Sequence, residues 1–211
     1  MPTLPPVTKA LILLCTAVFC LQTLLPYTPL GHLVEIGLGL WPIGSGRFMP
    51  WQVLTYAFLH GSFLHLFFNM YGLWMFGAEL EGLWGTRRYL QFLAVSAITG
   101  GLVFLLLEVI LGAGSLLIGA SGALYGLLLA NAMLFPHRPM LLIIPPVQTT
   151  MRTFVIVFGL ISVFMIGLQA PNWMAEFAHL GGVLGGWLMI LYWRGRPPFG
   201  GRGRGGPRRL H

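Results

Sequence analysis

Long apolar segments follow one another along almost the whole chain. Each has about 17 to 23 residues, within the range of about 17–25 that a membrane-spanning helix needs at a rise of about 1.5 Å per residue. Hydrophobic residues make up 56% of the sequence and charged residues 8%, whereas soluble domains have roughly 25% charged residues. The sequence therefore predicts an all-α integral membrane protein and leaves no room for a separate soluble domain.

We expect six membrane-spanning helices, separated by segments that contain Gly, Pro or charged residues. Their predicted ranges are 7–25, 62–83, 89–111, 119–135, 151–169 and 173–193. Together they would form one domain over residues 1–193. Residues 194–211 carry six of the twelve basic residues among Gly and Pro, which is typical of a disordered cationic tail. The connection 26–59 is too apolar for a free loop, so we expect it to pack against the bundle.

The basic residues predict the orientation of these helices. With the N-terminus in the cytoplasm, Arg47 is the one basic residue on the outer side, and the other eleven of twelve are cytoplasmic. Both termini would then be cytoplasmic, in a bacterial-type plasma (inner) membrane. The net charge of +7 comes mostly from the tail. It therefore concerns topology and lipid headgroups, and we expect the bilayer but no nucleic acid as a partner.

Four polar residues from three predicted helices lie at one depth. At about 1.5 Å per residue, Ser121 and His179 lie roughly 21 and 22 Å above the inner boundary of the hydrocarbon. His65 and Asn69 lie roughly 24 and 18 Å above it. Polar groups are costly at that depth and usually functional. The sequence therefore indicates a polar site about 10 Å below the outer surface.

Residue spacings agree with such a site. His65 and Asn69 are four residues apart and share one helix face, as do Ser121 and Tyr125. Taken singly, each residue also has a structural interpretation. A serine or an asparagine can form hydrogen bonds between helices, a buried histidine can be a hydrogen-bonded core residue, and a tyrosine can serve in packing alone. Their common depth favours the functional interpretation.

Glycines predict which helices meet. His179, Gly182 and Gly186 share one face of the last helix, where the glycines allow another helix to approach closely. The fourth helix repeats the same spacing with Gly122 and Gly126. Packing these two faces together would bring the histidine of the last helix against the serine of the fourth.

The residue inventory limits the chemistry. A serine beside a helix N-terminus can act as a nucleophile if a base takes its proton. The sequence contains no aspartate, so a Ser-His-Asp triad and an aspartyl dyad are excluded. A membrane metalloprotease needs His-Glu-x-x-His, but His60 is followed by Gly61 and the motif does not occur. We therefore expect no metal and no cofactor.

Four stretches of this sequence resemble one known family. They are Gly119-Ala120-Ser121-Gly122 with Tyr125, Ala178-His179-Leu180-Gly181-Gly182 with Gly186, the His60, His65 and Asn69 series, and the stretch from Gly77 through Glu81 and Gly85 to Arg88. In this order they resemble the rhomboid intramembrane serine proteases, in the family's basic six-helix form. The resemblance covers about residues 10–193 and implies a six-transmembrane-helix rhomboid bundle.

The resemblance also implies roles. Ser121 would be the nucleophile and His179 its general base, in a dyad that needs no aspartate. Tyr125 would pack on the histidine ring and replace a third triad member. His65, Asn69 and the main-chain N–H of Ser121 would form the oxyanion hole.

Other family positions are implied to support this site. Gly119 belongs to the serine motif, and Gly182 and Gly186 belong to the histidine motif. His60 would be a structural hydrogen-bonding residue near the loop, and Glu81 and Arg88 would be structural too. The family often has Trp-Arg in the first loop, and this chain has Trp51-Gln52. The departure concerns the hydrogen bonding of the loop and not the chemistry.

The function implied is a serine endopeptidase that cleaves transmembrane helices of membrane proteins. The alternative is a proteolytically inactive relative that binds membrane proteins or serves in quality control, although such relatives usually lack the serine or the histidine. A small transporter is disfavoured because two matching halves with interrupted helices are not evident. The sequence predicts neither the substrate nor an oligomeric state.

Overall fold

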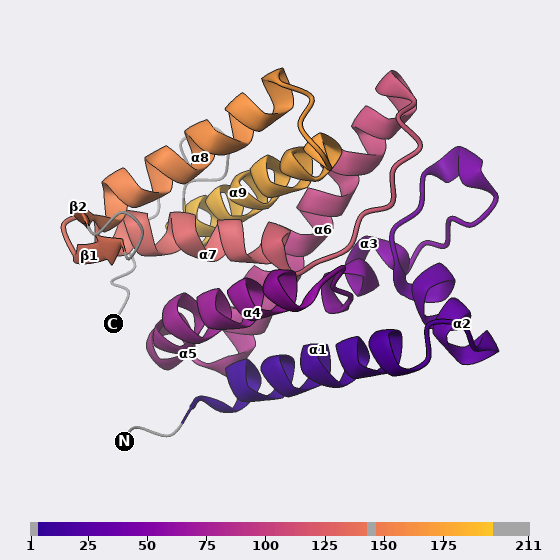
Figure 1. The fold of residues 1–211 in the computed structure, drawn as a ribbon. Coiled ribbons are helices and arrows are strands. Elements are labelled where there is room, and N and C mark those ends of the chain that lie inside the picture. Colours follow the sequence, from indigo (N-terminus) through magenta and orange to yellow (C-terminus); the bar gives the residue numbers. More distant parts are fainter. Residues whose placement is uncertain (1–3, 143–146, 196–211) are drawn as a thin grey trace.

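A computed structural model describes residues 4–142 and 147–195, and most of them are helical (Figure 1). The helices are α1 (Pro6–Leu24), α2 (Pro29–Leu38), α3 (Gln52–Thr55), α4 (Phe63–Gly72), α5 (Ala78–Trp84), α6 (Thr86–Leu111), α7 (Ser121–Leu134), α8 (Met151–Gly167) and α9 (Trp173–Trp193). The shorter elements are η1 (Ile43–Ser45), η2 (Tyr56–Phe58), the π-helical turn η3 (Leu73–Gly77), and strands β1 (Pro139–Leu142) and β2 (Val147–Thr150). The predicted tail lies outside the described residues from residue 196 on.

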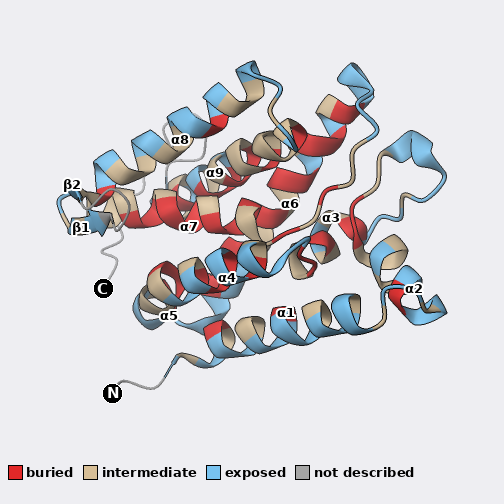
Figure 2. Ribbon diagram, in the orientation of Figure 1, coloured by how far each residue is buried: buried red, intermediate tan, exposed pale blue. Residues whose placement is uncertain are grey.

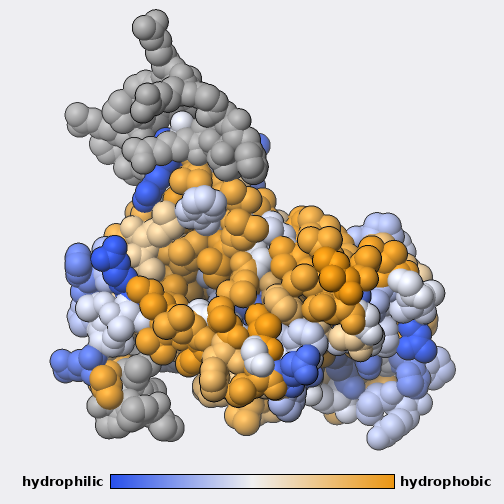
Figure 3. All heavy atoms as spheres, turned by 90° about the horizontal axis from the view of Figure 1, so that it is seen from above, coloured by the Kyte–Doolittle hydropathy of each residue, from blue (hydrophilic) through white to orange (hydrophobic). Residues whose placement is uncertain are grey.

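Among the described helices, α1, α6 and α9 are long and apolar enough to cross a membrane, and α7 and α8 are shorter apolar helices. Hydrophobic residues cover most of the face seen in Figure 3, and hydrophilic residues gather mainly toward its two ends. A surface of this kind is favourable in lipid and unfavourable in water. The chain is therefore an integral membrane protein built mostly from α-helices.

The predicted helix 62–83 contains a π-helical turn. α4 passes through η3 into α5 without a break in the chain. In η3 the main-chain oxygen of Phe76 accepts a hydrogen bond of 3.3 Å from Nδ2 of Asn131, a fully buried residue of α7. A π-turn disturbs the regular pattern of main-chain bonds, and this side chain from another helix supplies a donor there.

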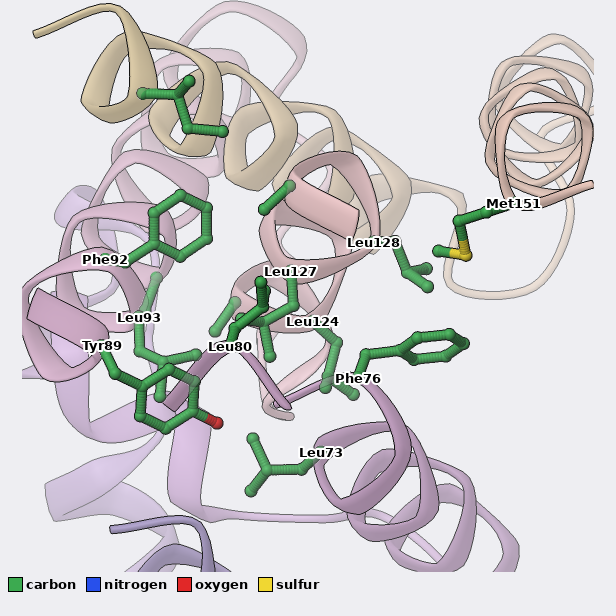
Figure 4. Packing of buried hydrophobic residues seen from close by; sticks show 14 residues of the cluster. Leu73, Phe76, Leu80, Tyr89, Phe92, Leu93, Leu124, Leu127, Leu128 and Met151 are labelled. Atoms are coloured by element: carbon green, nitrogen blue, oxygen red, sulfur yellow. The ribbon is translucent and has the colours of Figure 1, made fainter. Parts of the chain in front are cut away.

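Helix α7 forms the centre of the larger core. Its side chains Leu124, Leu127 and Leu128 point toward Leu73 and Phe76 of η3 and toward the neighbouring helices (Figure 4). Most of α7 is buried, whereas α1 and α8 expose much of their length (Figure 2). The residues that begin α7 are thus held by packing on several sides.

The glycines of α7 and α9 meet as the sequence predicts. A Cβ atom added to Gly182 would lie 1.9 Å from the carbonyl oxygen of Gly122, and one added to Gly186 would lie 3.1 Å from Cα of Gly126. No side chain fits into the first of these gaps. The two backbones can approach this closely only because these positions are glycine.

A β-hairpin connects α7 with α8, between the predicted helices 119–135 and 151–169. Strands β1 and β2 pair antiparallel, with Pro139 opposite Thr150. Proline is tolerated at the first residue of an edge strand, and the β-branched Thr149 and Thr150 favour extended backbone. The described residues remain mostly helical, and this short hairpin is an addition to the predicted helices.

The connection between α1 and α4 packs against the bundle through α2, α3 and η2, as the sequence predicts. The buried Gln52 holds it together, because its Nε2 donates to the carbonyl oxygens of Ile36 and Arg47 at 2.8 and 3.1 Å. Its Oε1 accepts from the main-chain N–H of Met49 at 3.1 Å. Glutamine thus satisfies main-chain groups at the position where the family often has arginine. The half-exposed Trp51 donates from Nε1 to the carbonyl oxygen of Gly37 at 2.8 Å.

Glu81 anchors the start of α1. Its buried carboxylate accepts hydrogen bonds from the main-chain N–H groups of Val7 and Thr8 at 2.9 and 2.7 Å and from the Thr8 hydroxyl at 2.8 Å. The first N–H groups of a helix have no partner within the helix, so a carboxylate there is favourable. Arg88 is exposed on α6, and its structural role stays a prediction.

Candidate active site

Ser121 is the first residue of α7. The helix begins there and not at residue 119, because Gly119 has a φ of 120° that a helix does not allow. The main-chain N–H of Gly119 donates to the carbonyl oxygen of Tyr56 at 2.9 Å, which holds the turn before the helix. The serine therefore lies at a helix N-terminus, where free N–H groups favour negative charge.

The structure brings Ser121 and His179 into contact. The serine Oγ lies 2.7 Å from Nε2 of the histidine. The Tyr125 ring stacks on the histidine ring, with the centroids 4.3 Å apart and the planes 4° from parallel. The tyrosine hydroxyl accepts a hydrogen bond of 3.0 Å from Ser162 of α8. Contacts from two helices thus fix the plane of the imidazole.

Glu176 also belongs to this cluster, although it was not among the residues predicted for the site. Its Oε2 lies 2.8 Å from Nδ1 of His179, one turn further along α9. An ionised carboxylate only accepts hydrogen bonds, so Nδ1 carries the proton and Nε2 is left to accept the proton of the serine hydroxyl. The i,i+3 spacing of this pair on a predicted helix was the available signal.

His65 lies against the turn that precedes Ser121. A Cβ atom added to Gly119 would lie 2.6 Å from Nε2 of His65, so the ring covers this glycine. Its Nδ1 accepts from the main-chain N–H of Gly61 at 3.3 Å. A neutral histidine that accepts at Nδ1 carries its proton on Nε2. His65 therefore presents a donor near Ser121.

Asn69 is buried one turn after His65 and faces the same site. Its Nδ2 donates to the carbonyl oxygen of His65 at 2.7 Å. An amide group has two N–H bonds, so one remains for another acceptor. Asn69 and Ser121 line the same groove.

The main-chain N–H of His60 donates to Oε1 of Gln22 at 3.1 Å, and the role of His60 as a structural hydrogen-bonding residue stays a prediction. Neither ring nitrogen has a partner among the described residues. The ring instead packs edge-on against His65, with the centroids 5.0 Å apart. Burial, and secondarily the neighbouring His65, lower the pKa of His60 to about 4, so this ring is neutral at pH 7.

A groove of about 470 Å³ lies beside Ser121. Its walls come from α4 and η3 on one side and α8 on the other, with α7 as the floor. The lining residues are Phe68, Asn69, Tyr71, Gly72, Met75, Phe76, Ser121, Leu124, Tyr125, Leu128, Phe154 and Phe158. The groove is thus almost entirely apolar, with its polar groups near the serine.

Fold and site together define a class of protein, a helical membrane protein with a serine and a histidine in hydrogen-bond contact at a helix N-terminus. The family model for the Rhomboid domain matches residues 47–196 of the chain. This match covers more than half of the sequence and includes the serine, the histidine and the His65–Asn69 face. The chain belongs to the rhomboid family.

Curated relatives agree with this assignment. The chain is 36% identical over 99 residues to Rhomboid protease GlpG of Klebsiella pneumoniae, an alignment that covers 46% of this chain and 34% of that protein. It is 31% identical over 97 residues to Rhomboid protease GlpG of Yersinia pestis, covering 46% of this chain and 33% of the relative. The alignments therefore span about a third of the length of these relatives.

Proposed function

We propose that the chain is an intramembrane serine endopeptidase with Ser121 as nucleophile and His179 as general base. The observation that carries the proposal is the distance of 2.7 Å between the serine Oγ and Nε2 of the histidine. A hydroxyl is a weak nucleophile until a base in hydrogen-bond contact takes its proton. The names of the curated relatives support the same reaction class.

The reaction would proceed in two steps. As the serine Oγ attacks the substrate carbonyl carbon, its proton moves to Nε2 of His179, which then gives it to the leaving amine. The acyl-enzyme is then hydrolysed by water, which the same nitrogen deprotonates. The serine recovers its proton at the end, so neither a metal nor a cofactor is needed.

Three donors would stabilise the oxyanion that forms in each step. They are Nε2 of His65, the free N–H of the Asn69 amide and the main-chain N–H of Ser121 at the start of α7. The positive end of the helix dipole of α7 would add to these donors. The ring of His65 reaches this position because Gly119 has no side chain.

The groove beside Ser121 suits a segment of a transmembrane helix as substrate. Its lining is apolar and its volume of about 470 Å³ accommodates several side chains. A helical substrate hides its carbonyl groups in its own hydrogen bonds, so it must unwind before it reaches the serine. The proposed arrangement has six spans, with cytoplasmic termini and the site near the outer surface of the inner membrane.

Covalent labelling with a serine-reactive fluorophosphonate tests the proposal. The wild-type protein should be labelled, and Ser121→Ala should remove the label. Ser115→Ala is the matched control, because this serine lies in the connection before α7 and outside the described contacts of His179. Failure of the folded wild-type protein to react would contradict the protease and favour the inactive relative.

A further inference from the structure

We infer that Glu176 is a positioning residue for His179, so that the site works as a Ser-His-Glu triad. The inference rests on the proposed protease function and extends it. Glu176 and His179 lie one turn apart on α9, with Oε2 2.8 Å from Nδ1. Their side chains are 22% and 14% exposed, so both are largely shielded from solvent. The other histidine nitrogen faces Ser121.

The three side chains form one line of hydrogen bonds. Ser121 Oγ, the two nitrogens of His179 and Glu176 Oε2 are joined by distances of 2.7 and 2.8 Å. The carboxylate holds the tautomer with the proton on Nδ1, and this tautomer leaves Nε2 free to act as base. When the base takes the serine proton, the imidazolium ion is stabilised by the adjacent negative charge. The proton on Nδ1 stays on the ring, so the carboxylate is not consumed.

A serine of the neighbouring helix α8 lies beside the carboxylate. Ser162, a fully buried residue of α8, bonds to the Tyr125 hydroxyl and also lies beside the Glu176 carboxylate. The titratable groups that face the histidine are Glu176 on its own helix, Tyr125 on α7 and His65 on α4. Of these, Glu176 alone is an acid that can balance a positive charge on the ring.

The location of Glu176 in the first turn of α9 has a simpler explanation. Acidic residues are favourable near any helix N-terminus because of the helix dipole. That explanation requires no contact with a histidine and predicts the same effect for any acid in the first turn. It does not account for the alignment of the carboxylate with Nδ1 on the side opposite the serine. Activity measurements separate the two explanations.

The test compares Glu176→Gln, Glu176→Asp and Glu176→Ala with the wild-type full chain in detergent, using cleavage of a fluorogenic transmembrane peptide. Glu176→Gln should lower kcat by roughly 10- to 150-fold, the value of one hydrogen bond to a charged group, with KM within about twofold. Glu176→Asp should recover part of the loss. The exposed Glu35→Gln is the matched control, because it removes an equal charge from the folded connection.

A second readout does not depend on turnover. In protein labelled with ¹⁵N-histidine, the signal assigned by its absence in His179→Ala should show the Nδ1–H tautomer, and Glu176→Ala should alter it. Wild-type kcat in folded Glu176→Gln, or an unchanged tautomer signal in Glu176→Ala, overturns the triad while leaving the protease intact. A wild-type protein that neither cleaves nor accepts the fluorophosphonate overturns the proposed function and the triad's role in it.

Discussion

The two sides of α7 are built differently. Toward α9 the helix presents Gly122 and Gly126, and the backbones lie so close that no side chain fits between Gly122 and Gly182. Toward α4, η3 and α8 it presents leucines, and a groove of about 470 Å³ remains. The buried residues of α8 are Met151 and Ser162, whereas α7 buries most of its length (Figure 2).

This difference separates two requirements of the proposed chemistry. The distance between Ser121 and His179 must be held within a fraction of an ångström, and the glycine contact between α7 and α9 does so. A substrate segment needs room, and the loosely packed side toward α8 supplies it. We call the face of α7 toward α9 the close-packed side and its face toward α4, η3 and α8 the open side. Substitutions on the close-packed side should therefore have larger effects than those on the open side.

The largest effect is expected at the contact between serine and histidine. Ser121→Ala and His179→Ala should each remove nearly all cleavage, and the double variant should be no worse, because the two residues act as one unit. Cleavage of a transmembrane peptide by purified variants measures this. Losses that add in the double variant would show that the two groups act separately.

The glycine contact should come next. Gly182→Ala pushes α7 and α9 apart, since its Cβ would lie 1.9 Å from a carbonyl oxygen. We expect a loss of about 1–3 kcal/mol in the free energy of unfolding and a fall in kcat of about 100-fold or more. Gly159→Ala on α8 is the matched control, because nothing lies within 4 Å of its new Cβ atom. Equal effects of the two substitutions would remove the contrast between the two sides.

An intermediate effect is expected at Asn69. Asn69→Ala removes one proposed oxyanion donor and should lower kcat by roughly 10- to 1,000-fold. Thermal unfolding should remain cooperative, because the hydrogen bond lost connects two residues of the same helix. A variant that unfolds but keeps normal activity per folded molecule would make Asn69 a structural residue instead.

Much of the close-packed side could be predicted from the sequence. The spacing of four between glycines on two helices and the common depth of Ser121 and His179 follow from helix geometry alone. Glu176 could not be selected this way, because an acid three residues before a histidine is also common on ordinary helix surfaces. Its role depends on which way the ring points, and neighbours on α7 and α8 decide that.

Features of the open side were harder to predict for the same reason. The carbonyl oxygen of Phe76 in the π-turn η3 accepts a hydrogen bond from Asn131 on α7, and no pattern within residues 73–77 predicts this contact. The hairpin of β1 and β2 depends on pairing between strands on either side of a proline-rich segment. Such features depend on partners that are distant in the sequence, and the periodicity of one segment carries no information about those partners.

Changes in substrate unwinding should have a smaller effect than removal of Ser121 or His179. Single-span substrates should be cleaved near the outer end of their helix, at small residues followed by Gly, Pro or polar residues. Replacing one such Gly by Leu should slow cleavage about fivefold, and replacing Pro about 100-fold, following their helix propensities. Mass spectrometry of the released fragments locates the cut. Equal cleavage of an all-Leu helix, or a cut in the cytoplasmic third, would contradict the proposed orientation and access.

The smallest effect is expected at an ion pair on the open side, close to β1 and β2. Arg138 pairs with Glu79 of α5, and its carbonyl oxygen accepts the main-chain N–H of Met151 at the start of α8. The two side chains are 35% and 36% exposed, so water screens the pair and its contribution is about 0–1 kcal/mol. Arg138→Gln should therefore change the unfolding free energy by less than about 1 kcal/mol and leave kcat within about twofold. Glu79→Gln and the double variant complete a cycle, measured by denaturant unfolding and peptide cleavage. A coupling energy above about 2 kcal/mol, or a large change in KM, would contradict this prediction. It would mean that the ion pair holds α8 against η3 and that the open side is more tightly packed than the contacts indicate.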